Sequence, residues 1–121
     1  MEFKDCQYLA SHEWVEFDGD IAIVGVSDYA QSEMGDVVFV ELPEEGDEVT
    51  AGKGFANVES VKAVFDILSP VDGEIVEVNY DLEDSPELVN QNAFDAWLVK
   101  IKFTKKSDEL LSVDKYKELC K

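Results

Sequence analysis

A chain of 121 residues with 45% hydrophobic side chains can bury one small core, and we expect a single domain over residues 1–121. Its 28 acidic against 10 basic residues give a net charge of -18, which repels phosphate backbones and anionic lipid headgroups. We therefore expect neither nucleic acid nor a membrane surface as a partner. No apolar run approaches the roughly 18 residues that a membrane-spanning helix needs.

The cysteine content points to a reducing compartment. Cys6 and Cys120 lie near opposite ends of the chain and are too few for the disulfide framework of a small secreted domain. The first residues lack both a signal-peptide core and an Arg-rich transit pattern. We expect the bacterial cytoplasm, or the mitochondrial matrix if this is a processed eukaryotic chain.

Short β-branched segments separated by turn residues predict a mainly β fold of the sandwich or barrel type. The Asp18-Gly19 pair predicts a tight hairpin between the first two strands. Turn residues, including Pro70 and Gly73, separate the later ones. The expected strands cover residues 14–17, 21–26, 37–42, 55–58, 64–68, 74–78 and 97–103.

Three short helical segments interrupt this β pattern. The first lies between Ser27, which can cap a helix N-terminus, and Gly35, which suits its end. A helical turn is expected at 84–88 with Pro86 at its first position, where a missing N–H costs little. From Ser107 onward, the spacing of apolar residues predicts an amphipathic C-terminal helix that covers one end of the sandwich. Those apolar residues are Leu110, Leu111, Val113, Tyr116 and Leu119.

No self-contained active site is recognisable. The single histidine, His12, and two distant cysteines cannot make a structural zinc site without recruiting carboxylates, so no metal is expected. His12 is read as a structural histidine and not as part of a catalytic triad. The glycines around Lys53 do not have the spacing of a phosphate-binding loop. The composition argues against a self-contained active site.

One lysine has unusual surroundings. Lys62 lies between two strand-like runs, with no Gly or Pro near it and the small Ala63 after it. A lysine at the tip of a tight hairpin is exposed and accessible to a modifying enzyme. A solvated surface lysine would fit the same local pattern, so the pattern alone does not assign a function.

A longer motif around this lysine resembles a known family. The segment Glu59-Ser60-Val61-Lys62-Ala63 is similar to the lipoylation motif of glycine cleavage system H proteins. The resemblance extends over nearly the whole chain, in the family's order and spacing, through residues 11–15, 28–31, 35–42 and 86–90. It implies a barrel-sandwich hybrid of the lipoyl- and biotinyl-carrier type, with lipoate attached to Lys62. Related biotin carriers flank their lysine with methionines, whereas Val61 and Ala63 flank Lys62, which disfavours biotin.

The resemblance also implies a role and a set of partners. Lipoyl-Lys62 would accept an aminomethyl group from glycine decarboxylase (P protein) and carry it to the aminomethyltransferase (T protein), where tetrahydrofolate takes the one-carbon unit. Dihydrolipoyl dehydrogenase (L protein) would reoxidise the dithiol, and a lipoate ligase or lipoyl/octanoyl transferase would attach the arm. In the family the loaded arm can fold back, and residues matching Ser11, Glu13 and Asp66 contact its amine.

Two departures from the family and several alternatives remain. The segment 92–97 lacks the family's proline and glycines, so its turn must avoid the positive backbone angles that glycine allows. Phe65 stands where small or polar residues are usual.

The lysine motif does not separate glycine cleavage from an H-like carrier for lipoyl transfer to 2-oxoacid dehydrogenases or for sulfur metabolism. An unmodified interaction domain and an autonomous enzyme are further readings, and the intact motif argues against the first.

Overall fold

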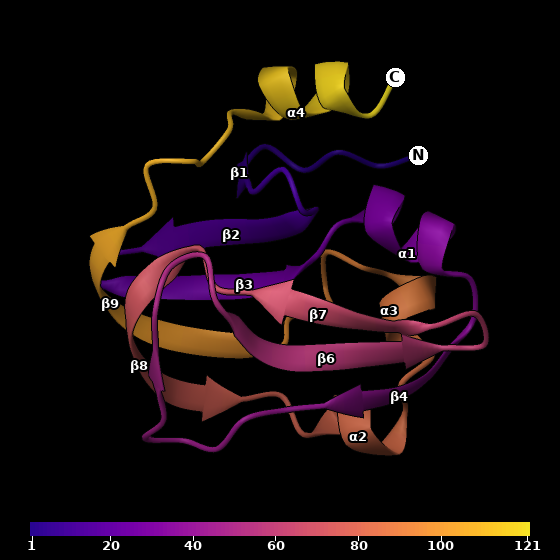
Figure 1. Ribbon diagram of the computed structural model, residues 1–121, viewed down its shortest axis with the longest axis horizontal. Helices are drawn as coiled ribbons and strands as arrows, with labels where there is room; N and C mark the ends of the chain where they lie inside the picture. The colour runs from indigo at the N-terminus through magenta and orange to yellow at the C-terminus, as the bar shows by residue number, and fades with distance from the viewer.

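The computed structural model describes residues 1–121 and contains nine strands and four short helices (Figure 1). None of the helices has the length and apolar character that crossing a membrane would require. The elements in chain order are β1 (Gln7–Tyr8), β2 (Glu13–Asp18), β3 (Ile21–Val26), α1 (Asp28–Met34), β4 (Val37–Glu41), β5 (Glu48–Val49), β6 (Gly54–Ser60), β7 (Val64–Leu68), β8 (Val71–Val78), α2 (Asp81–Asp84), α3 (Leu88–Gln91), β9 (Val99–Lys106) and α4 (Val113–Leu119).

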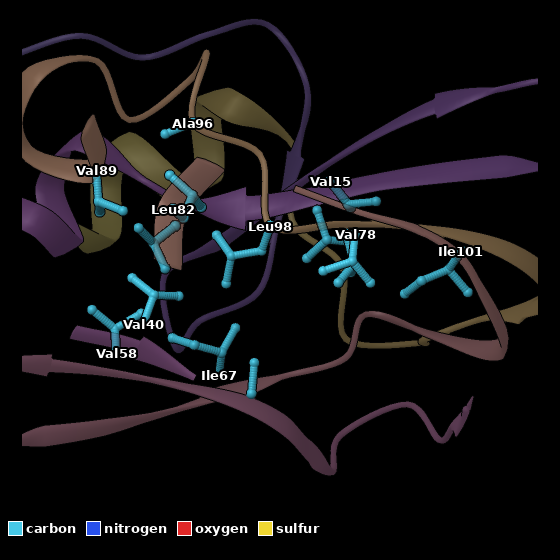
Figure 2. Close-up of a cluster of buried hydrophobic side chains, with 14 of the residues drawn as sticks. Val15, Val40, Val58, Ile67, Val78, Leu82, Val89, Ala96, Leu98 and Ile101 are labelled. Carbon is cyan, nitrogen blue, oxygen red and sulfur yellow. The ribbon is translucent and has the colours of Figure 1, made fainter. Parts of the chain in front are cut away.

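The strands form two antiparallel sheets that enclose the core. One sheet has the order β1-β2-β3-β9-β8-β5 and the other the order β4-β6-β7. Figure 2 shows Val40, Val58 and Ile67 of the smaller sheet reaching into the core. Val15 and Ile101 of the larger sheet belong to the same buried cluster. The expected mainly β, barrel-sandwich architecture with short helices is confirmed.

Local sequence signals predict the boundaries of several elements at the correct residues. β3 and β7 have the predicted bounds. The Ser27 hydroxyl caps α1 by accepting a hydrogen bond from the Ala30 N–H at 3.0 Å. Gly35 ends the helix with φ 78°, a left-handed conformation that glycine adopts without strain. The predicted helix between Ser27 and Gly35 is therefore confirmed, and it brings the chain to the start of β4.

The role predicted for Gly73 is wrong. It is not a turn residue, because β8 begins at Val71 and runs through it. A Cβ at this position would lie 2.3 Å from the carbonyl oxygen of Lys102 and 2.8 Å from the Cα of Phe103, both in the backbone of β9. The register of β8 against β9 shifts between Asp72 and Gly73, so the glycine permits a close approach of two backbones at a bulge.

The predicted helical turn at 84–88 is confirmed in part, because a turn with Pro86 at its first position leads into α3. The Leu88 N–H donates to the Ser85 carbonyl at 3.1 Å, and the Val89 N–H donates to the Pro86 carbonyl at 3.2 Å. Ser85, which precedes the proline, has φ -134° and ψ 67°, a conformation outside the helical region. The ring of a proline disfavours helical angles in the residue before it, so the chain breaks there. On either side Leu82 and Val89 are fully buried, and this packing holds the two short helices in place.

The C-terminal helix exists but is shorter than predicted. Ser112 caps α4 by accepting a hydrogen bond from the Lys115 N–H at 3.3 Å, so Leu110 and Leu111 precede the helix. Leu111 instead exchanges two backbone hydrogen bonds with Tyr8, of 2.7 and 2.9 Å. This pairing holds α4 beside β1, at one edge of the larger sheet (Figure 1). Helical spacing in the sequence could not reveal a bridge to a residue so distant in the chain.

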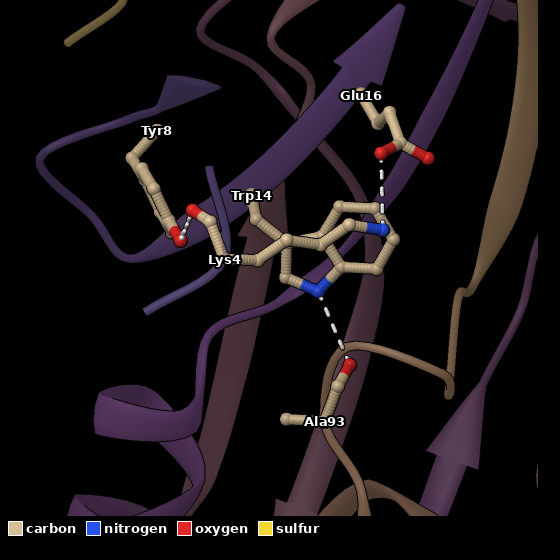
Figure 3. Close-up of polar contacts among 5 residues, drawn as sticks. All are labelled: Lys4, Tyr8, Trp14, Glu16 and Ala93. Atoms are coloured by element: carbon tan, nitrogen blue, oxygen red, sulfur yellow. Dashed lines mark hydrogen bonds and ion pairs between the residues drawn. The ribbon is translucent and has the colours of Figure 1, made fainter. Parts of the chain in front are cut away.

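A second cluster of buried side chains, mainly aromatic, packs the two ends of the chain and the 92–97 loop against the larger sheet. The Trp14 indole N–H donates to the Ala93 carbonyl at 3.1 Å (Figure 3), and Phe94 is buried against Trp14. Lys4 forms an ion pair with Glu16 at 3.0 Å and its carbonyl accepts a hydrogen bond from Tyr8. Every residue of the loop has a negative φ, as expected for a segment without glycine.

Candidate functional site

Lys62 lies at the tip of the hairpin that joins β6 to β7, between Ser60 and Val64, and its side chain is exposed. The tip is closed by a hydrogen bond of 2.8 Å from the Ser60 N–H to the Ala63 carbonyl. The buried Ser60 hydroxyl accepts a further one from the Lys62 N–H at 3.1 Å. One small polar side chain therefore fixes the backbone from which the lysine projects.

The tip also rests on the end of α1. The Val61 N–H donates to the Asp36 carbonyl at 3.0 Å, and Lys62 Nζ donates to the Glu33 carbonyl at 3.1 Å. The last carbonyl groups of a helix carry partial negative charge and attract a cation. A Cβ on Gly35 would stand 3.6 Å from Lys62 Cε, which is ordinary van der Waals contact. No carboxylate forms an ion pair with Lys62.

A pocket of about 230 Å³ opens between α1 and β7, next to this lysine. Glu33, whose carbonyl accepts the Lys62 hydrogen bond, also lines the pocket and so joins the two features. The pocket brings together Ser11 and Asp66, two residues proposed from the sequence for the arm cleft. Its apolar wall consists of Val26, Ala30, Met34, Phe65 and Ile67.

The pocket and the lysine fit an acyl arm of the lipoyl type. An exposed amine that bonds only one backbone carbonyl is free to form an amide, and an apolar wall beside it suits an alkyl chain and a sulfur-containing ring. Phe65, the bulky residue that departs from the family, forms part of this wall and leaves the pocket open.

Glu13, the third residue proposed for the arm cleft, lies behind the pocket. Its side chain is buried, and its carboxylate accepts hydrogen bonds from the Ser11 hydroxyl and, at 2.7 Å, from the Leu68 N–H. Burial raises the pKa of the Glu13 carboxyl, while these two donors act in the opposite direction. Glu13 therefore orients Ser11 and ties β2 to β7.

The raised pKa of Glu13 gives a pH-dependent contribution to stability. The native state holds the Glu13 proton more tightly than the unfolded chain, whose carboxyl has the ordinary value of 4.5. This contribution is present below that value and is lost as pH rises through the folded pKa. Glu13→Gln removes the titration, so its free energy of unfolding should fall less steeply than that of the wild type above about pH 4.5.

Denaturant unfolding of both proteins over this pH range measures the difference. Glu48→Gln, which changes an exposed glutamate of β5, is the matched control and should follow the wild type. Parallel curves for wild type and Glu13→Gln would contradict the raised pKa.

His12 is both a structural residue, as expected, and part of the pocket. It is the one non-glycine residue with a positive φ, of 80°, and its Nδ1 lies 2.8 Å from the Tyr116 hydroxyl. The same hydroxyl lies 2.5 Å from Ser27 Oγ, so α4 is linked to the start of α1. Burial lowers the pKa of the His12 imidazole, opposed by the Glu33 carboxylate.

The sequence did not single out the residues that α1 adds to the pocket. Tyr29 and Met34 line it, and the Tyr29 ring centre lies 4.8 Å from that of His12. Tyr29 belongs to the 28–31 segment that resembles the family, and that resemblance could have indicated a residue of the site. No sequence feature indicated that Met34 belongs to the site.

Comparisons with known proteins agree with this geometry. The family model described as "Glycine cleavage H-protein" matches residues 6–121. The glycine cleavage system H protein of Treponema denticola is 58% identical, with 100% of both chains covered. That of Staphylococcus carnosus is 48% identical, over 96% of this chain and 94% of the relative. A crystal structure of a glycine cleavage system H protein from Mycobacterium marinum superposes with a TM-score of 0.90 at 37% identity, over 98% of this chain and 97% of the other. The chain therefore belongs to the glycine cleavage H-protein family and is a carrier component of the glycine cleavage system, not a catalyst itself.

Proposed function

We propose that Lys62 carries the lipoyl group, joined to its Nζ by an amide bond. Family membership supports a lipoyl carrier, and the position of Lys62 at an exposed hairpin tip beside the pocket is the observation that carries the assignment. When bound, the group supplies a disulfide that can accept a fragment and then be restored by reoxidation. The protein itself supplies position and shelter.

The contacts of Lys62 suit such an arm. The hydrogen bond from Nζ to the Glu33 carbonyl does not require a charge, because an amide N–H at the same nitrogen can still donate. The base of the arm would then stay against the end of α1, at the rim of the pocket. Acylation also removes one positive charge from a protein that already has a net charge of -18.

The polar rim of the pocket suits a protonated amine. Asp66 is exposed at the rim and offers a carboxylate, and the Ser11 hydroxyl can accept a hydrogen bond while it donates its own proton to Glu13. The pocket would therefore hold the amine of the carried fragment and limit its contact with water.

We further propose the partners that this role requires. Glycine decarboxylase would load the carrier, the aminomethyltransferase would unload it, dihydrolipoyl dehydrogenase would reoxidise it, and a lipoate ligase or lipoyl/octanoyl transferase would attach the arm. The relatives named above are bacterial, which supports the bacterial cytoplasm as the place of these reactions. Reconstitution with glycine decarboxylase, followed by exchange of labelled bicarbonate into glycine, tests the function directly. No exchange with the lipoylated protein would contradict it.

The sheltering role of Asp66 predicts a moderate effect. Asp66→Asn removes the charge but keeps the size, so the loaded carrier should release its fragment to water faster by about two- to fivefold, a modest factor because this carboxylate is exposed. The measurement follows this release without partner enzymes, with lipoylation equal in all samples. Asp108→Asn, an exposed acid after β9, is the control and should match the wild type. Equal rates in all three proteins would show that Asp66 does not shelter the amine.

A further inference from the structure

Four exposed apolar side chains lie on the hairpin that carries Lys62 and on β4, which pairs with that hairpin. Val61 and Val64 of the hairpin are 68% and 58% exposed, and Val38 and Phe39 of β4 are 49% and 45% exposed. We call these four residues the tip platform. They are half of the large hydrophobic side chains that the protein exposes, and the other four are Met1, Val76, Tyr80 and Leu119. Apolar groups gathered in one place on a small protein mark a contact surface.

A β-bulge produces this exposure on β4. The register of β4 against β6 shifts between Val37 and Phe39, so Val38 is an extra residue in the strand. Regular alternation would expose only one of two consecutive residues. Here Val38 and Phe39 are both exposed, while Val37 and Val40 on either side are buried. Bulges re-aim side chains in this way and are frequent beside functional sites.

The outer face of the smaller sheet carries residues of the tip platform together with acidic groups. Phe39, Glu59 and Val64 lie side by side across β4, β6 and β7. The next row on the same face, two residues further along each strand, is Glu41, Asn57 and Asp66. None of the three carboxylates in these rows forms an ion pair. The face thus presents apolar side chains nearest Lys62 and unneutralised negative charge around them.

We infer that the outer face of β4, β6 and β7 is the docking surface for the enzyme that attaches the arm to Lys62, and that this enzyme presents an apolar surface bordered by basic side chains. The inference rests on the proposed function. All ten basic residues of the chain are lysines, so the attaching enzyme must choose one lysine of ten. Only surface features of the unmodified protein can direct that choice, and the tip platform includes Val61, next to Lys62 in the hairpin, and Phe39, which pairs with Glu59. Enzymes that act on the loaded carrier can also bind the arm itself.

The acidic groups of this face are the reason for inferring a basic border on the enzyme. Glu59 lies between the two apolar side chains of its row, and Glu41 and Asp66 lie beyond. A basic side chain of the partner placed against Glu59 would be flanked by apolar contacts, which exclude water and strengthen the pairing. The same acidic face would repel an enzyme surface of negative charge.

The test uses the unmodified protein with purified lipoate ligase, lipoate and ATP. Val64→Asp and Phe39→Asp should each raise the KM for the carrier about tenfold or more, because each removes an apolar contact and adds a charge to it, while kcat stays within about twofold. Val76→Asp changes an exposed valine of β8 in the other sheet and is the matched control, with an unchanged KM. Thermal unfolding verifies that each variant is folded, and Val64 lies on an edge strand that tolerates the change.

A second measurement separates the attaching enzyme from other occupants. The variants are lipoylated to completion with excess ligase and then assayed with glycine decarboxylase. The KM of this reaction should change less than that of the ligase reaction. A larger change with the decarboxylase, or equal ligase KM values for Val64→Asp and Val76→Asp, would overturn the inference while the proposed function stands. Failure of the wild type itself to take up lipoate at Lys62 would overturn both.

Discussion

Lys62→Arg should abolish carrier activity, with the exchange of labelled bicarbonate into glycine falling to the rate of the decarboxylase without a carrier. A guanidinium stays charged and cannot form the amide that a lysine forms. It can still donate to the Glu33 carbonyl at the end of α1, so the thermal midpoint should shift by no more than about 2 °C.

Lys53→Arg, a change at another exposed lysine, is the control and should keep full exchange. Substantial exchange by Lys62→Arg would show that another group carries the fragment.

Gly73→Ala should cause the largest loss of stability among the glycine-to-alanine changes of this chain, about 3 kcal/mol. The added Cβ would lie 2.3 Å from the Lys102 carbonyl oxygen and 2.8 Å from the Phe103 Cα. Both atoms belong to the backbone of β9, so no side chain can rotate away, and β8 and β9 must separate within the larger sheet. Guanidinium unfolding, or a fall in the thermal midpoint of about 10 °C, would measure the effect.

Gly19→Ala provides the comparison for this loss. Gly19 has φ 60° in the β2–β3 turn, and nothing lies within 4 Å of its added Cβ. Gly19→Ala should lower the free energy of unfolding only by the backbone strain of a left-handed alanine, about 1 kcal/mol. Equal losses for the two alanine variants would show that close approach of β8 and β9 does not determine the stability.

The elements that the sequence predicted well are those set by neighbouring residues. α1 lies between a serine that caps it and a glycine that ends it, and both signals are local. The bounds of β3 follow from the Asp-Gly turn before it and the capping serine after it. Gly73 gave the wrong answer because glycine serves both turns and close approaches, and only the partner strand β9 shows which applies.

The candidate site was predictable in part for the same reason. A contiguous motif located Lys62, but the burial of Glu13 and the contributions of His12, Tyr29 and Met34 depend on how α1 lies over β7. The tip platform was hidden in a continuous apolar run, Val37 to Val40, that reads as a fully buried strand. Only the register against β6 reveals the bulge that turns two of its side chains outward.

The assignment of the lipoyl group to Lys62 is tested most directly by peptide mass spectrometry of the protein after incubation with lipoate, ATP and a lipoate ligase. If Lys62 carries the arm, a single lipoyl amide should be found on the peptide that contains it, and none of the other nine lysines should be modified. A lipoyl group on a different lysine, or an unmodified Lys62 after complete reaction, would contradict the assignment.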